Sequence, residues 1–172
     1  WHLSSLLKSS DRVVYLGRLR VTLPGVAGEG GRVHVREHFV RVLTEAGQPL
    51  TTEALFAAAR ATIDFGDLHA RLMLIRPPFV KCDDDTWGLV DRDLPGGAPA
   101  AEAAVEHVEI VLQRRDRGLT AHQLQRELHT LGAAHSRWTR EMCVGVLRGS
   151  PSFRISRSGN VGLADWDTVR VP

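Results

Sequence analysis

Residues 79–91 read FVKCDDDTWGLVD, an apolar segment, a run of three aspartates and a second apolar segment. The alternation in the first segment is typical of a short strand, and the aspartates are typical of a solvated turn. Trp87-Gly88-Leu89 then supplies a return strand, so the stretch predicts a β-hairpin. The pattern recurs at residues 153–165, FRISRSGNVGLAD, with Gly159 and Asn160 at the turn. Two copies of one pattern predict two domains of one type.

The repeat extends over the segments that precede each hairpin. Two offsets, 69 residues over the helical part and 74 over the hairpin, align the copies in one order. The aligned pairs include Glu37-His38 with Glu106-His107, Leu50-Thr51 with Leu119-Thr120, Phe79 with Phe153, and Gly88-Leu89 with Gly162-Leu163. We call residues 33–97 the first copy and residues 104–172 the second copy.

A third, weaker match precedes both copies. Residues 6–23 (LLKSSDRVVYLGRLRVTL) align without a gap on residues 146–163 (VLRGSPSFRISRSGNVGL). We therefore expect residues 1–24 to be the last helix and hairpin of a unit whose front half is absent from this chain. This alignment turns three apolar side chains inward: Val13, Val21 and Leu23. The alternative is a helix and two strands of another kind.

Three helical patterns precede each hairpin, because apolar residues recur there at helical spacing. The expected inward residues of the first helices are Val35, Phe39, Val42, Leu43 and Ala46, and Val105, Val108, Val111 and Leu112. Those of the second helices are Leu55, Phe56 and Ala59, and Leu124, Leu128 and Leu131. Those of the third helices, at about 67–76 and 136–148, are Leu68, Leu72 and Ile75, and Trp138, Met142 and Val146. Thr51 and Thr120 are expected N-caps, the second with Gln123 in a capping box. Residues 94–104, LPGGAPAAEAA, indicate a turn running into a new helix.

Three helices followed by a β-hairpin outline a winged helix. The entry to the second helix reads Gly47-Gln48-Pro49-Leu50 or Gly118-Leu119-Thr120, and the hairpin carries Phe79-Val80 and Trp87-Gly88-Leu89. With these motifs the chain resembles the HARE-type helix-turn-helix winged domains, as in the delta subunit of bacterial RNA polymerase. In the second copy Val161 stands where that family usually has Trp.

The resemblance implies a mainly α fold with short β-hairpins, that is α+β, built from tandem winged-helix repeats. The expected domains are 1–32, the end of a truncated unit plus a linker, then 33–97 and 104–172. Phe79 with Trp87 or Leu89 would close the three-helix core of the first copy, where an aromatic side chain buries about 150–250 Å². Gly88 would admit a close backbone approach.

The sequence offers little chemistry. Asp83, Asp84 and Asp85 at a hairpin tip point in different directions, and His34 and His38 lack a third metal ligand. No phosphate loop, Gly-x-Ser-x-Gly or Cys-x-x-Cys occurs. We expect no enzyme, metal, cofactor or small-molecule substrate. The two cysteines indicate packing residues, and the absence of long apolar runs and of a signal peptide predicts a cytoplasmic protein without membrane contact.

Charge divides unevenly along the chain: residues 1–35 carry a net +3, residues 36–97 a net −3 and residues 105–172 a net +3. In DNA-binding winged helices the third helix enters the major groove and the hairpin contacts phosphate, so both need positive charge. The second copy offers five candidate DNA-binding residues: Arg137, Arg140, Arg148, Arg154 and Arg157. The first copy instead places three aspartates at its hairpin tip.

The favoured function is therefore a non-catalytic DNA-binding module of a larger transcription or DNA-processing protein, with duplex DNA contacted by the second copy. The alternative is a protein-protein interaction scaffold that docks to RNA polymerase or another subunit. The resemblance to the delta subunit and the acidic first copy favour this alternative.

Overall fold

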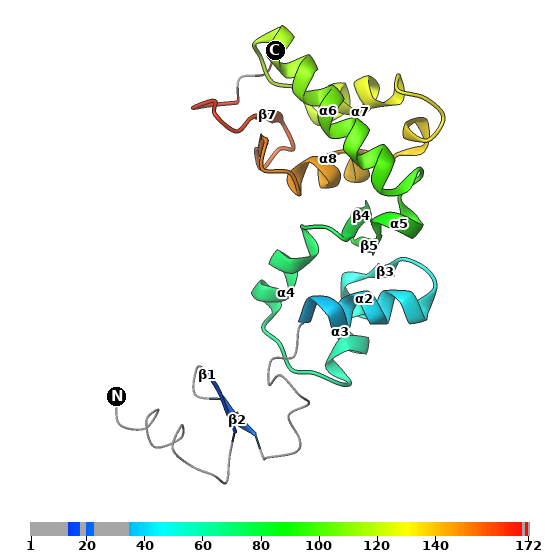
Figure 1. Cartoon of the computed structure of the whole chain (residues 1–172), viewed down its shortest axis with the longest axis vertical. Helices are drawn as coiled ribbons and strands as arrows, with labels where there is room; N and C mark the ends of the chain where they lie inside the picture. The colour runs from blue at the N-terminus through cyan, green and yellow to red at the C-terminus, as the bar shows by residue number, and fades with distance from the viewer. Residues whose placement is uncertain (1–13, 18–19, 23–34, 170, 172) are drawn as a thin grey trace. The chain divides into compact units, whose positions relative to one another are not determined.

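The computed structural model describes residues 14–17, 20–22, 35–169 and 171 (Figure 1). Internal contacts divide the chain into an amino-terminal unit, Trp1–Val35, and a main unit, Arg36–Pro172. The described residues are mainly helical with small antiparallel sheets, which confirms the α+β class.

The amino-terminal unit contains a two-stranded antiparallel ribbon, β1 (Val14–Gly17) and β2 (Arg20–Thr22). Tyr15 pairs with Val21 in it. The helix expected before this ribbon lies outside the described residues, as do Val13 and Leu23. The side chain of Val21 is not described, so the structure does not test the inward placement expected for these three residues.

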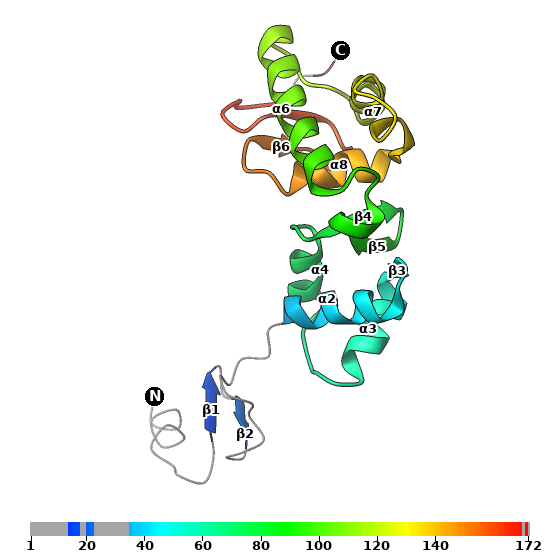
Figure 2. The same cartoon turned by 45° about the vertical axis from the view of Figure 1, so that its right-hand side comes forward.

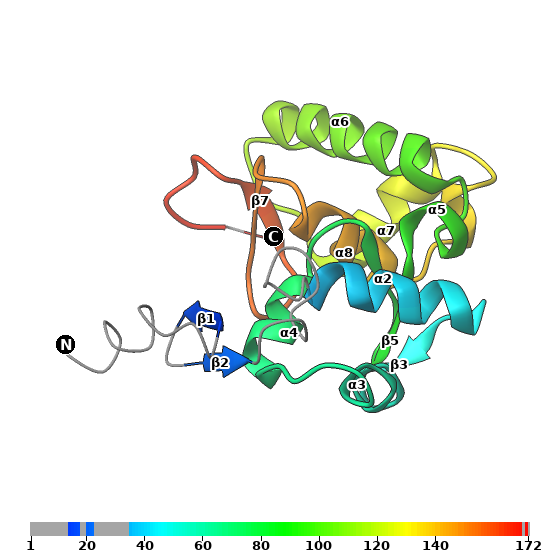
Figure 3. The same ribbon diagram turned by 60° about the horizontal axis from the view of Figure 1, so that its bottom comes forward.

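The main unit repeats one order of elements: a helix, a short strand or bridge, two helices and a hairpin. The first set is α2 (Val35–Ala46), β3 (Leu50–Thr51), α3 (Thr52–Arg60), α4 (Asp67–Leu74), β4 (Phe79–Asp83) and β5 (Thr86–Leu89), followed by the short α5 (Val90–Asp93). The second set is α6 (Gly97–Arg115), α7 (Ala121–His129), the 3-10 turn η1 (His135–Arg137), α8 (Arg140–Arg148), β6 (Phe153–Ile155) and β7 (Val161–Leu163). The expected turn before the second set is short, because α6 already begins at Gly97. α6 runs along one side of α7 and α8 (Figure 3).

Strand pairing follows the same offsets as the sequence repeat. Leu50 pairs with Trp87 in the first copy, and Leu119 forms a bridge with Val161 in the second. Phe79 pairs with Leu89, and 74 residues later Phe153 pairs with Leu163. The amino-terminal pair of Tyr15 with Val21 corresponds to the pair of Ile155 with Val161. A slip of one residue in the pairing would turn every side chain of a strand to the other face of its hairpin. The shared alternation of side chains in these hairpins therefore explains why their strands pair in the same register.

The expected helix starts are present. Thr51 caps α3 by accepting a hydrogen bond from the main-chain nitrogen of Ala54, and Thr120 caps α7 in a capping box with Gln123. Such a cap stabilises a helix by about 1 kcal/mol relative to Ala.

Four phenylalanines form the core of the first copy. Phe39 stacks on Phe56 at 5.7 Å between ring centroids and meets Phe65 edge-on at 5.2 Å and Phe79 at 6.3 Å. The second copy replaces this cluster with aliphatic residues around one tryptophan. Its fully buried side chains include Val108, Leu112, Leu119, Leu124, Leu128, Trp138, Leu147 and Val161. The inward faces expected for the first two helices of both copies are thus largely confirmed, although Ala46 is exposed.

The expected inward face of the third helix in the first copy is wrong. Leu68 is 74% exposed and Leu72 53% exposed, while Ala70 and Leu74 are fully buried. Both α4 faces are apolar, so spacing alone cannot select the one that meets the core. Phe65, two residues before the start of α4, is buried against Phe39 and Phe56, and the small Ala70 lies inward. In the second copy Trp138 and Met142 are buried as expected, although α8 starts only after Trp138, and Val146 is half-buried.

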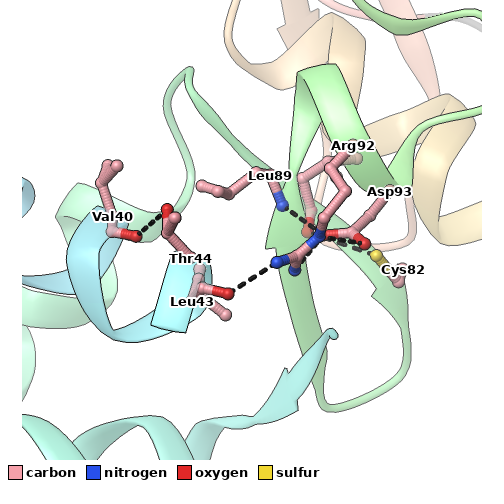
Figure 4. Close-up of polar contacts among 8 residues, drawn as sticks. Val40, Leu43, Thr44, Cys82, Leu89, Arg92 and Asp93 are labelled. Carbon is pink, nitrogen blue, oxygen red and sulfur yellow. Dashed lines mark hydrogen bonds and ion pairs between the residues drawn. The ribbon is translucent and has the colours of Figure 1, made fainter. Parts of the chain in front are cut away.

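Figure 4 shows how the first hairpin is tied to α2. The carboxylate of Asp93 accepts hydrogen bonds from the main-chain nitrogen of Leu89, at 2.7 Å, and from Arg92. Arg92 also donates to the main-chain oxygen of Leu43 at 2.6 Å. A Cβ at Gly88 would lie 2.7 Å from Cγ of Asp93. A close approach is therefore present at Gly88, but it is made by the side chain of Asp93 and not by another backbone segment as expected.

Candidate functional site

Helix α8 packs on β4, the edge strand of the β3-β5-β4 sheet (Figures 1 and 2). The hydroxyl of Thr139, the N-cap of α8, donates a 2.9 Å hydrogen bond to the main-chain oxygen of Cys82. A Cβ at Gly145 would lie 3.7 Å from Lys81, so the helix approaches the strand closely. The second copy thereby covers an edge that would otherwise be free to pair.

This packing leaves little of α8 accessible. Within α8, all of which the structure describes, only Arg140 and Arg148 are exposed. The remaining side chains are buried or half-buried. The buried ones are Met142, Cys143, Val144 and Leu147. α8 is the third helix of the second copy, the element expected to read DNA, and it would have to leave β4 to enter a major groove about 12 Å wide.

A groove of about 370 Å³ lies where α8, the β4–β5 hairpin and the loop between β6 and β7 meet. We call it the inter-copy groove. Its apolar lining includes Leu74, Ile75, Phe79, Trp87 and Val144. Its charged lining consists of Lys81, Arg140, Arg148 and Arg157 with Asp84 and Glu141.

The five predicted DNA-binding residues do not form one surface. Arg140, Arg148 and Arg157 line the inter-copy groove. Arg137 is exposed on η1 and lines a different cavity, beside residues 91–99. Arg154 donates to the main-chain oxygens of Asp167, at 2.8 Å, and Ala164, at 3.3 Å. Its guanidinium group thus holds the segment after β7.

Electrostatic partners differ among the three groove arginines. Arg140 forms a 3.2 Å ion pair with Glu141. Among the described residues, no ion pair is formed by Arg148, Arg157 or Lys81. The last three cations therefore remain available to an external anion.

Two features of this region were not expected from the sequence. The sequence places Lys81 in a strand of the first copy, as one of the few cations opposing the acidic hairpin tip, whereas the structure places it in a groove whose other wall is α8 of the second copy. Leu68 and Leu72 were assigned to the core, and they form an exposed pair one helical turn apart on α4. The helical spacing of Leu68 and Leu72 correctly indicates that they share one face of α4. It does not reveal whether that face packs on the core or is exposed to solvent.

The three aspartates at the first hairpin tip are used individually. Asp83 accepts from the main-chain nitrogen of Asp84 at 2.8 Å, and Asp85 accepts from the Thr52 hydroxyl at 2.6 Å. Across the residues with described positions, no group of three or more His, Cys, Asp or Glu could hold a metal. His34 lies outside those residues.

Both thiols are poorly reactive in this environment. Burial, together with the charge of Asp93, raises the pKa of Cys82 to about 11, and burial raises the pKa of Cys143 to about 12. A thiolate is the reactive form, so neither residue has the environment of a nucleophile.

A transmembrane segment would need about 20 predominantly apolar residues in one helix. None of the helices in the described ranges is long and apolar enough to cross a bilayer.

No protein-family model, curated protein or solved structure matches this chain.

Proposed function

We propose that the first and second copies are winged-helix units of the HARE type and that they act together, without catalysis, as a protein-interaction scaffold. The repeated order of helix, strand or bridge, two helices and hairpin supports the winged-helix assignment. The packing of α8 on β4 is the observation that favours a protein-interaction scaffold over a DNA-binding module. It occupies the helix that a DNA-binding winged helix inserts into the major groove.

The exposed face of α4 supports the same choice. Leu68 and Leu72 are exposed one turn apart on α4, where a protein partner can bury their apolar surface, whereas a phosphate backbone offers them no partner. Arg71, on the same helix, lies 5.7 Å from the ring centroid of Phe56, so part of the charge beside the leucines is held against the protein. The apolar pair is thus the most accessible hydrophobic feature of α4.

A capture experiment tests the scaffold proposal. The immobilised protein is compared with the L68S/L72S variant and with the I110S variant in capturing proteins from lysate of the source cells. Ile110 is 46% exposed on α6 and provides the matched control for loss of an exposed aliphatic side chain. We expect one or a few proteins to be retained by the unaltered chain and by I110S and lost with L68S/L72S. Equal retention by all three would contradict the proposal, provided that circular dichroism shows them equally folded.

Duplex DNA is the second candidate partner, because three of the predicted arginines line one groove. With α8 on β4, such binding would be limited to phosphate contacts. The test is a titration with random-sequence duplex at low and moderate salt, using the R148E/R157E variant. Both arginines are exposed and, unlike Arg154, form no side-chain hydrogen bond or ion pair within the part of the chain that the structure describes.

If DNA is the partner, the titration should show a steep salt dependence. Each lost phosphate contact would reduce the logarithmic slope by about 0.9. The control is R114E/R126E, with exposed arginines on α6 and α7. Binding that depends on Arg148 and Arg157 and not on the control pair would favour DNA over the scaffold.

A further inference from the structure

We infer that the inter-copy groove binds an acidic amphipathic segment of a partner protein; this inference rests on the scaffold function proposed above and names the chemistry of its partner.

We use the term apolar strip for Leu68, Leu72 and Ile75 together with the apolar lining of the groove. Leu68 and Leu72 lie one turn apart on α4, and Ile75, the C-cap residue of that helix, follows three residues after Leu72 at the spacing that keeps the same face. Ile75 is half-buried and lines the groove. Apolar side chains of a partner can therefore lie along α4 and continue onto the floor formed by Phe79 and Val144. This strip recognises an amphipathic segment rather than a uniformly charged one.

The charges at the rim select acidic side chains. Four cations and two carboxylates line the groove, and one carboxylate, Glu141, is already paired with Arg140. Lys81, Arg148 and Arg157 remain for the partner's carboxylates. Exposed pairs contribute only about 0.2–1 kcal/mol each, so they give specificity and orientation, while burial of the apolar strip gives most of the affinity.

The size and lining of the groove fit a peptide better than a nucleic acid. A volume of about 370 Å³ lies at the lower end of the range of about 300–1,000 Å³ that is typical of ligand pockets. Single-stranded nucleic acids bind to basic grooves with aromatic platforms for successive bases. Here the accessible aromatic is Trp87, which is half-buried and donates its indole N–H to Thr52 at 2.9 Å. Asp84 would also face a phosphate chain across the groove.

Selection from a displayed library of random 16-residue peptides tests the inference. The unaltered chain, R148E/R157E and R114E/R126E are immobilised in parallel, and enriched peptides are sequenced. We expect the unaltered chain to enrich peptides with excess Asp and Glu and with apolar residues at helical spacing. Affinity of a synthesised enriched peptide should fall about tenfold for R148E/R157E, the effect of losing two exposed charge pairs. It should be unchanged for R114E/R126E.

Three outcomes would overturn the inference. They are enriched peptides without acidic excess, equal affinity for R148E/R157E and the unaltered chain, and affinity that L68S/L72S leaves unchanged. A single-stranded oligonucleotide of 20 thymidines is measured beside the peptides. Binding of this oligonucleotide that requires Arg148 and Arg157, without acidic peptide enrichment, would assign the groove to nucleic acid instead.

The failures of the two proposals are distinguishable. If capture from lysate depends on Leu68 and Leu72 but selection yields no acidic peptides, the scaffold proposal stands and the groove inference falls. If capture is also indifferent to the leucines, both fall.

Discussion

The Thr139 hydroxyl donates a 2.9 Å hydrogen bond to the main-chain oxygen of Cys82, which joins the N-cap of α8 to the edge strand of the other copy's hairpin. The same hydroxyl accepts from the main-chain nitrogen of Met142 at 3.1 Å. One side chain therefore both caps the start of α8 and attaches that helix to β4.

Substitutions at Gly145 test the close approach of α8 to β4. G145A should be neutral or stabilise the protein by up to about 1 kcal/mol, because Ala favours helix over Gly and its Cβ would lie at an ordinary 3.7 Å from Lys81. G145L should destabilise the protein by about 1–3 kcal/mol, because the longer side chain must displace the strand. Urea denaturation of both variants checks this. If Leu is tolerated as well as Ala, α8 does not lie on β4 in solution.

The two tryptophans at the junction should differ in their contribution to stability. Trp138 is 1% exposed and donates to the main-chain oxygen of Pro95 at 2.8 Å, so W138A should cost about 3–5 kcal/mol. Trp87 is half-buried, and W87A should cost less. The sequence motif alone assigns the large effect to Trp87. The urea midpoints of W138A and W87A show which substitution destabilises the protein more. A larger destabilisation by W87A would show that the hairpin tryptophan contributes more to stability than Trp138.

His38 should make the protein less stable in acid. Burial lowers the pKa of His38 from its usual 6.5, and the positive charge of Arg41, which donates to Nδ1, lowers it further, whereas Ala59 and Glu45 act in the opposite direction. The unfolded chain then binds this proton more readily than the folded chain. Neutral His38 therefore contributes fully to the free energy of unfolding above the unfolded pKa of about 6.5. This contribution is lost as the pH falls below 6.5 toward the lower pKa of the folded state.

The free energy of unfolding should therefore fall less steeply between pH 7 and pH 5 in H38Q than in the unaltered chain. H122Q is the control, since His122 is exposed on α7. Parallel curves for H38Q and the unaltered chain would show that His38 titrates normally. His107 occupies the equivalent position in the second copy, and Nε2 of both rings is buried without a hydrogen bond among the described residues.

The thiols should be protected until the chain unfolds. With pKa values of about 11 and about 12, Cys82 and Cys143 hold little thiolate at pH 8. Relative to a free cysteine, the reaction of Cys82 with a disulfide reagent should be slower by about tenfold or more, because the thiolate fraction falls by about two orders of magnitude and the greater nucleophilicity of a high-pKa thiolate offsets only part of that. Absorbance of the released thiol in native and guanidinium-unfolded protein measures both rates. Rapid native reaction of the C143S variant would mean that Cys82 is accessible and ionised.

Local patterns in the sequence determined most of the elements. The alternation around Phe79 and Phe153 specified both hairpins, Thr51 and Thr120 specified helix starts, and the spacing of Phe39 and Leu43 specified a buried helix face. These features depend on neighbours within a few residues, or on hydrogen bonds that each hairpin closes within itself. The repeat offsets then predicted which strand residues correspond.

Tertiary structure alone decided which surfaces were left for a partner. Leu68 and Leu74 both lie on apolar faces of α4, and only the packing of Phe65 against its neighbours selects the face that is buried. Arg154 and Arg157 look alike in sequence, but the first holds the chain after β7 and the second lines the groove. The contact of Thr139 with Cys82 joins residues 57 apart. Helical and strand periodicity define faces within an element, whereas the face that remains exposed depends on long-range packing between elements.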